Sequence, residues 1–327
     1  MASRRLVRLG LGLAILVAVV AIVDPTRVAA GVAAADLRLA IPAVLGLTAA
    51  HAVMAVGWRR MVVQRGGPRL SLATALRAHY AAQGLGSVTP GNLGSDVHRA
   101  AALRQAGQPW TVAVEPLVVQ RATSYLALSL LAAIGLAILS SASDVSLTIV
   151  LIGSAAAAGL LVTTWLVLAP VGPMLVLRAR VLCRLGDPDA GFTPHQPWPV
   201  LATGLLCGTV FHAGSIGLTW LVVVAVDPTF ATWPILAALA VARLSLAVPI
   251  SPSGLGVQEG TLMAITLGMR LAPEPVLAAM LVARVSTLLV GLLGALLLLG
   301  GMHRVAPHAD NAPSRVGRAR AFRSSIR

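Results

Sequence analysis

The sequence contains one short pattern twice, as Thr89-Pro-Gly-Asn-Leu-Gly94 and as Ser251-Pro-Ser-Gly-Leu-Gly256. An offset of 162 residues aligns the two prolines and the closing Leu-Gly pairs, and each stretch separates two apolar helical runs. Proline and glycine interrupt helices, and paired interruptions in corresponding hydrophobic segments are typical of transporter substrate sites. We therefore expect two re-entrant breaks, formed by Pro90, Gly91, Gly94, Pro252, Gly254 and Gly256.

The amino-acid composition indicates a membrane protein. Of 327 residues, 57% are hydrophobic and 11% are charged, whereas soluble domains carry about 25% charged residues. Several apolar runs reach the roughly 20 residues that a helix needs to cross a bilayer, and the sequence lacks the alternating pattern of a membrane barrel. The sequence therefore predicts an all-α polytopic membrane protein.

The distribution of charge argues against a nucleic-acid-binding protein, and the spacing of cysteine and histidine argues against a metal-binding or disulfide-stabilised protein. The net charge is +14, but the arginines stand in short segments between apolar runs and in the C-terminal tail, so we expect no nucleic-acid partner. Cys183 and Cys207 are isolated thiols without a CxxC spacing, which argues against a disulfide framework, a metal site and a cofactor. Four histidines are dispersed without metal-ligand spacing, namely His51, His79, His98 and His212.

Six apolar runs are interpreted as full spans. They cover residues 9–23, 39–56, 115–139, 147–169, 200–226 and 275–299. The first run follows three arginines and also fits a signal peptide, with a weak cleavage candidate at Ala29-Ala-Gly-Val-Ala33; we favour an uncleaved span. The breaks divide two further segments, 72–88 from 95–107 (with Ser95 as N-cap) and 233–248 from 257–268. The helices after the breaks, about 20 Å long, are too short to span.

The distribution of arginines predicts the orientation of the spans. If both broken segments are re-entrant, the arginine-rich connections fall on one side of the membrane together with both termini. Because basic residues concentrate in cytoplasmic loops, we expect a bacterial plasma-membrane protein with N-in and C-in topology. Residues 1–303 would form a single integral membrane domain, and residues 304–327 an Arg-rich, disordered cytoplasmic tail.

The two broken segments would then enter from opposite sides, which indicates an inverted repeat of two halves, roughly 39–140 and 200–300. Beyond the breaks, Val119-Gln-Arg121 aligns with Val282-Ala-Arg284 at an offset of 163. The alternative is chance, because Leu, Ala and Gly are so common in this chain that short matches arise without a repeat.

The helix after each break directs its unpaired N–H groups and positive dipole end into the membrane, where they favour an anion. Arginines at this depth would add bidentate hydrogen bonds to a phosphate. We expect a lipid-headgroup site that includes Arg99, Arg121, Arg243, Arg284, Asp96, Gln258 and Glu259. In the alternative interpretation, Arg121 and Arg284 pair with Asp96 and Glu259 as structural clamps. The two acids would carry protons for coupled transport or serve only as helix caps.

These motifs resemble the transmembrane-region family of lysylphosphatidylglycerol synthases, also described as flippase-like integral membrane proteins. The resemblance lies in Thr89-Pro-Gly-Asn-Leu-Gly-Ser-Asp-Val-His-Arg99, Val119-Gln-Arg121 and Pro249-Ile-Ser-Pro-Ser-Gly-Leu-Gly-Val-Gln-Glu-Gly260. It covers about residues 5–300. One departure is Gln120, where the family usually has glutamate, which puts an ion pair within that motif in doubt. The resemblance implies a lipid-handling or lipid-translocating domain. Larger members add a soluble aminoacyl-transferring domain, which we do not expect here.

Three functions fit these features. The first is a flippase-like protein that binds and translocates an anionic phospholipid or a polyprenyl phosphate. The second is a non-transporting membrane subunit that partners a glycosyltransferase or a lipid-modifying enzyme. The third is a membrane-embedded lipid-phosphate enzyme, against which the lack of a catalytic motif counts. We favour the first function and expect no enzymatic activity.

Overall fold

The computed structural model describes residues 24–89, 92–141, 155, 159, 197–230, 232–247, 251 and 253–301. Within these residues every regular element is helical. Several sequence predictions lie outside the described residues: the span 9–23, nearly all of the span 147–169, the tail 304–327, and the break residues Pro90, Gly91 and Pro252.

The described helices lie in two stretches of the chain, one before and one after the segment 142–196. The α-helices are α2 (Pro25–Ala34), α3 (Leu37–Gln64), α4 (Leu72–Gly86), α5 (Leu93–Gln105), α6 (Trp110–Ser141), α8 (Pro197–Val226), α9 (Trp233–Ala242), α10 (Val257–Gly268) and α11 (Glu274–Leu299). Two 3-10 helices, η1 (Pro228–Phe230) and η2 (Arg243–Ala247), follow α8 and α9.

Among the described residues, four helices are long and apolar enough to cross a membrane, namely Leu37–Gln64, Trp110–Ser141, Trp198–Val226 and Glu274–Leu299. They coincide with four of the six predicted spans. α3 continues past the predicted end at residue 56 because its polar C-terminal residues remain helical. Arg59, for example, stays in the helix and donates from Nε to the carbonyl oxygen of Leu70.

The start of α5 differs from the prediction. Ser95 is not the N-cap, because α5 begins at Leu93 and Asn92 stands at the cap position in a left-handed conformation (φ 59°). Thr89 supplies the capping oxygen instead, since its Oγ1 accepts the N–H of Gly94 at 2.9 Å. An upstream hydroxyl thus replaces the one that the sequence pattern favours.

Helix ends near the breaks follow the predicted pattern with small shifts. The helix predicted over 72–88 ends at Gly86. α5 ends at Gln105, and Gly107 lies just beyond it with φ 80°, as expected for a helix-terminating glycine. The helix predicted over 233–248 consists of α9 followed by the tighter turns of η2.

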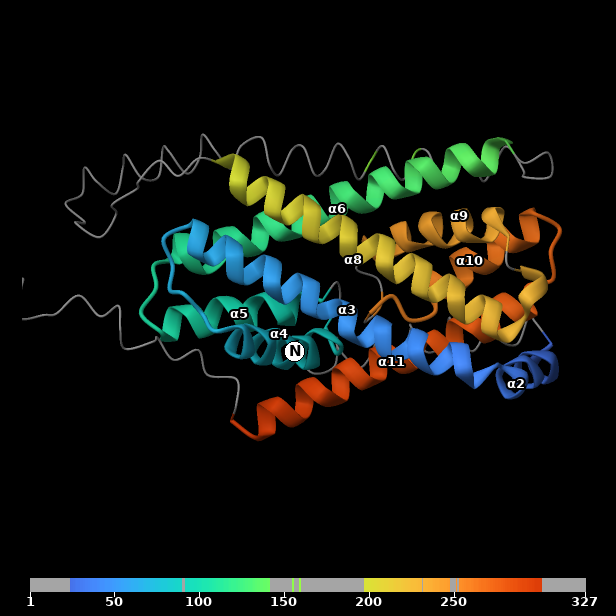
Figure 1. Ribbon diagram of the computed structural model, residues 1–327, viewed down its shortest axis with the longest axis horizontal. Coiled ribbons are helices and arrows are strands. Elements are labelled where there is room, and N and C mark those ends of the chain that lie inside the picture. Colours follow the sequence, from blue (N-terminus) through green and yellow to red (C-terminus); the bar gives the residue numbers. More distant parts are fainter. Residues whose placement is uncertain are drawn as a thin grey trace, which may run out of the picture.

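Two short helical hairpins lie toward opposite ends of the four long helices (Figure 1). In the first, α4 packs against α5, and in the second, α9 and η2 pack against α10. α11 crosses α4 closely where Gly294 meets Gly84, because a Cβ on Gly294 would lie 2.4 Å from the carbonyl oxygen of Tyr80. Glycine at this crossing lets the two backbones approach one another.

Buried apolar side chains form two main cores along the long helices. Leu47 and Leu136 belong to one core, together with side chains from α8, α9, α10 and α11. Trp58, Val62 and Leu117 belong to the other, together with side chains from α4 and α5. The segments of α3 and α6 between these two cores carry polar residues.

Candidate functional site

Polar side chains, buried or half-buried, occupy the middle of the long helices between the two apolar cores. His51 lies near the centre of α3, Ser124 near the centre of α6 and His212 near the centre of α8. We define the polar core as His51, His79, Gln83, Asp96, Arg99, Gln120, Arg121, Ser124, His212, Arg243, Glu259 and Arg284. Burying polar groups in the middle of a membrane costs free energy unless the groups are paired. The partners of these residues therefore indicate which kind of ligand the site can bind.

Asp96 joins two arginines in the first half of the polar core. It lies in the first turn of α5, where its Oδ1 accepts a hydrogen bond from Nη2 of Arg99 at 2.8 Å. Its Oδ2 lies 2.6 Å from Nη2 of Arg121 on α6. The predicted pairing of Arg121 with Asp96 is therefore confirmed, and one carboxylate serves two guanidinium groups.

Arg99 is anchored further by neutral groups. Its Nη1 donates to Oε1 of Gln120 at 2.9 Å, and Nε2 of Gln120 donates to the carbonyl oxygen of Met54 at 2.7 Å. The guanidinium lies 5.6 Å from the ring centroid of Trp58, within cation–π range. Because Gln120 is neutral, the group of Asp96, Arg99 and Arg121 carries one net positive charge.

Arg284 clamps the second break. Its Nε and Nη2 donate to the two carboxylate oxygens of Glu259 at 2.5 and 3.0 Å, while Nη1 donates to the carbonyl of Ser253 and Nη2 to that of Gly254 at 2.8 and 3.0 Å. Glu259 also accepts the N–H of Gly256 at 2.9 Å, as a capping residue does. Glu259 is therefore an ion-pair partner and a helix cap, the two structural roles among those that the sequence allowed.

Arg243 and Gln258 complete the predicted set. Arg243 begins η2 and is half-buried, and it forms no ion pair with a carboxylate among the described residues. It lies within electrostatic range of Arg284 and of His51 and His212. Gln258 is buried beside Glu259 in the first turn of α10.

Four arginines of the polar core thus face two carboxylates. Asp96 and Glu259 each neutralise one guanidinium, which leaves an excess of two positive charges among the described residues of the polar core. An excess of positive charge at this depth favours an anion of matching charge.

The glycines of the breaks let backbone segments meet at close range. A Cβ on Gly94 would lie 2.7 Å from the carbonyl oxygen of Leu85, so only glycine fits without a shift. Gly254 and Gly256 have φ of 67° and 76°, conformations that favour glycine. These positions explain why the two predicted breaks share glycine at their closing turns.

The sequence patterns did not reveal a cluster of histidines in the polar core. The ring centroids of His51 on α3 and His79 on α4 are 5.9 Å apart, and Phe211 on α8 lies 5.3 Å from His51. Gln83 reaches both imidazoles, one turn after His79. The sequence contained one indication of this cluster. His79 and Gln83 are four residues apart, which places both on one helix face.

Two further buried interactions join α6 to its neighbours. Oγ of Ser124 lies 2.9 Å from Nε2 of His212 on α8. Arg65 at the end of α3 forms an ion pair with Glu115 near the start of α6, and both side chains are largely buried. Arg65 and Glu115 carry no signal in the sequence pattern, because neither stands near a break.

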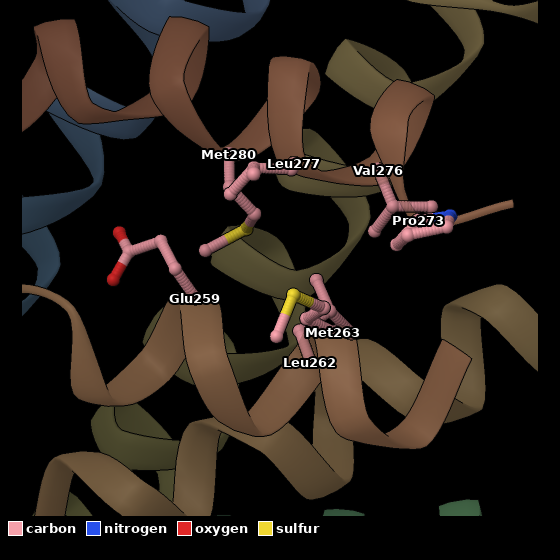
Figure 2. A pocket seen from close by; sticks show the side chains of 7 residues that line it. All are labelled: Glu259, Leu262, Met263, Pro273, Val276, Leu277 and Met280. Atoms are coloured by element: carbon pink, nitrogen blue, oxygen red, sulfur yellow. The ribbon is translucent and has the colours of Figure 1, made fainter. Parts of the chain in front are cut away.

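A small cavity lies between α10 and α11 (Figure 2). Its empty volume is about 150 Å³, and its lining consists of Glu259, Leu262, Met263, Pro273, Val276, Leu277 and Met280. Figure 2 shows the Glu259 carboxylate directed away from the two methionine side chains. No water-sized space remains free between these side chains, because the empty volume consists of gaps between atoms and open solvent, so this cavity is too small for a lipid headgroup.

The fold and the polar core define a helical multi-pass membrane protein with an excess of buried cations at mid-span. Comparison with known families gives the more specific assignment: the chain belongs to the lysylphosphatidylglycerol synthase TM region family, whose model matches residues 6–295. The predicted resemblance is therefore confirmed. No curated protein matches the chain.

Proposed function

We propose that this protein binds an anionic lipid, either a phospholipid or a polyprenyl phosphate, and translocates it across the membrane. The carrying observation is the excess of arginine over carboxylate in the polar core. A buried cation without a counter-charge is costly, and a phosphate supplies that counter-charge while the acyl chains stay in the bilayer. Membership of the lysylphosphatidylglycerol synthase TM region family supports a lipid-related role. The proposed role is transport rather than catalysis.

The contacts divide the four arginines into two roles. Arg99 and Arg284 are held by several partners and position the helices around the site. Arg243 forms no ion pair with a described carboxylate, and the side chain of Arg121 is 30% exposed. We assign the phosphate contacts to Arg121 and Arg243.

A topology of six spans and two re-entrant hairpins fits this proposal. Figure 1 shows the two hairpins toward opposite ends of the long helices, as an inverted repeat requires. The ion pair of Asp96 with Arg121 corresponds to that of Glu259 with Arg284. At the offset of 162 residues, Asn92 aligns with Gly254, and both have left-handed backbone (φ 59° and 67°). We propose N-in and C-in topology in a bacterial plasma membrane.

Reconstitution in lipid vesicles tests the transport proposal. Purified protein is placed in phosphatidylcholine vesicles with a trace of fluorescent phosphatidylglycerol, and an impermeant reductant quenches the outer leaflet. Transport makes the inner-leaflet label accessible as well. We expect Arg243→Gln to slow this phase roughly ten- to hundredfold, as expected for the loss of one charge-assisted hydrogen bond. A parallel assay with labelled polyprenyl phosphate separates the two lipid classes.

The matched control is Arg27→Gln, because Arg27 is a largely exposed arginine outside the polar core. It should transport lipid at the wild-type rate. Equal rates for wild type and Arg243→Gln would contradict the assignment of the site.

A non-transporting subunit is the second candidate. It is favoured by the engagement of Arg284 with Glu259 and two backbone carbonyls, which is the behaviour of a structural clamp. If neither lipid class crosses the membrane with folded wild-type protein, this candidate replaces the transport proposal. Its partner would then be a glycosyltransferase or a lipid-modifying enzyme.

A further inference from the structure

Gln83 bridges two histidines in the centre of the membrane-embedded helices. Its Nε2 lies 3.1 Å from Nδ1 of His51 and 3.3 Å from Nε2 of His79. Its Oε1 accepts a hydrogen bond from Nδ2 of Asn92 at 2.7 Å. A carboxamide nitrogen only donates, so both imidazole nitrogens that face it are acceptors. In this arrangement both histidines are neutral.

One hydrogen-bonding group of this histidine pair is left unused by its surroundings. His79 is 1% exposed, and its Nδ1 has no hydrogen-bond partner among the described residues. A buried donor without a partner costs free energy, yet position 79 carries a histidine and not an apolar side chain. Packing alone does not account for this choice.

We propose that His51 and His79 form a proton-binding site, and that Gln83 transmits its protonation to Asn92 at the start of α5. When a proton binds to either nitrogen that faces Gln83, that nitrogen loses its lone pair and becomes a donor. The carboxamide must then turn its oxygen toward the imidazolium. Asn92 thereby loses the acceptor that its Nδ2 uses in the neutral state.

Asn92 is well placed to carry this change into the polar core. It stands at the cap position of α5, one turn before Asp96. Asp96 in turn holds Arg99 and Arg121. A change in the hydrogen bond of Asn92 therefore reaches the ion pairs of the first half within two helical turns.

Nearby charges determine whether proton binding and anion binding favour or oppose one another. This step rests on the proposed transport function. A proton on either histidine is repelled by nearby arginines, and an anion bound among those arginines offsets the repulsion. By linkage, anion binding therefore favours proton uptake, and acidification favours anion binding. Among the described residues, the titratable and charged groups that face the two histidines are Tyr80 on α4, Arg99 on α5 and Arg243 in η2, while His212 on α8 lies beside Phe211, whose ring contacts His51.

Amide hydrogen exchange tests the proton site without any need for transport. The full chain is placed in nanodiscs of phosphatidylcholine, and exchange in residues 93–99 is followed from about pH 8 to about pH 4, which extends below the ordinary range of histidine because the nearby arginines repel the proton. After correction for intrinsic exchange, we expect the wild type to exchange roughly two- to tenfold faster at the acidic end, as for the loss of one hydrogen bond. Gln83→Met should remove this pH dependence.

Two further variants keep the test decisive if Gln83→Met does not fold. Gln83→Glu keeps an acceptor oxygen for Nδ2 of Asn92 in every protonation state of the histidines and should hold residues 93–99 at the alkaline exchange level across the range. His98→Gln, a matched histidine variant on α5 outside the cluster, should behave as wild type. The same pH dependence in wild type, Gln83→Met and Gln83→Glu would overturn the proposal.

Imidazole carbon and nitrogen signals of histidine-labelled protein give the independent readout. In wild type, signals that disappear in His51→Gln or His79→Gln should shift with pH in step with the exchange of residues 93–99. No pH-dependent shift in either signal would overturn the proton site whatever the protein does with lipid. Repeating the titration with phosphatidylglycerol in the nanodisc tests the coupling to an anion. An unchanged titration midpoint there would contradict the coupling and the proposed headgroup site, but not the proton site.

Discussion

Arg284 contacts residues on both sides of the closing turn of the second break through one planar guanidinium. Its donors hold the Glu259 carboxylate at the start of α10 and the carbonyl groups of Ser253 and Gly254 before it. Lysine could not replace this arrangement, because an ammonium lacks the fixed fork of donors. The residue therefore fixes the position of α10 relative to α11 before any ligand binds.

Removing this arginine should destabilise the protein strongly. In Arg284→Met, the carboxylate of Glu259 remains buried without its counter-charge, and breaking a buried ion pair on one side costs about 3–5 kcal/mol. The double variant Arg284→Met with Glu259→Gln removes both charges and should recover part of that loss. Unfolding in mixed micelles, followed by circular dichroism, measures both values.

The control for this cycle is Arg27→Met, whose ion pair with Asp24 is exposed and should have no measurable effect. If the effects of Arg284→Met and Glu259→Gln on the unfolding free energy simply add in the double variant, the guanidinium and the carboxylate of the second break do not depend on one another.

Close backbone contact between α4 and α11 connects the first hairpin to the last span. Gly294 and Gly84 meet there, and the nearest backbone atoms would lie 2.4–2.7 Å from a Cβ on Gly294. The helix that carries His79 and Gln83 is thereby held against α11. A separation of these two helices would move His79 relative to His51 on α3.

Gly294→Ala should therefore destabilise the bundle by about 1–3 kcal/mol, the usual cost of overpacking. Gly214→Ala is the matched control, because a Cβ on Gly214 in α8 meets no atom within 4 Å. The unfolding free energies of both variants in mixed micelles test the crossing. Equal values would mean that the two backbones do not touch there.

The helices themselves were largely predictable, because long apolar runs and Pro/Gly interruptions are local features of the sequence. The start of α5 was not, since Thr89 reaches the N–H of Gly94 from outside the helix and makes Ser95 unnecessary as a cap. Capping by a residue five positions upstream depends on the path of the backbone through the break, which the local pattern does not specify.

At the scale of the whole molecule, the charged half of the polar core was predictable and the histidine half was not. The arginines and acids stand beside the two repeated motifs, so their pairing followed from the alignment. His51, His79 and His212 come from α3, α4 and α8, and their meeting depends on how these three helices pack. Helix packing of this kind carries no signal in residue spacing. The same holds for Arg65 and Glu115, which join the ends of α3 and α6.

The arrangement of helix ends supports the proposed topology. Figure 1 shows α2, the turn after α8 and the start of α11 at one end of the bundle, while the end of α3, the end of α5 and the start of α6 lie at the other. In the proposed topology the first set lies on the outside of the membrane. The second set includes the arginine-rich connections and lies on the cytoplasmic side. One membrane normal along the long helices therefore satisfies both the geometry and the charge bias.

Single cysteines test this topology in whole cells. In a background with Cys183 and Cys207 replaced by serine, Pro228→Cys occupies an exposed position in the turn after α8, and Gln105→Cys an exposed position at the end of α5. An impermeant thiol reagent should label position 228 in intact cells and position 105 only after lysis, because an even number of crossings separates residue 105 from the cytoplasmic N-terminus. Labelling of position 105 but not of position 228 from outside would mean that the first hairpin segment crosses the membrane once, because one extra crossing reverses the side of every later position. The two hairpins would then not be related by inversion, and the correspondence between the Asp96 and Glu259 ion pairs would lose its explanation.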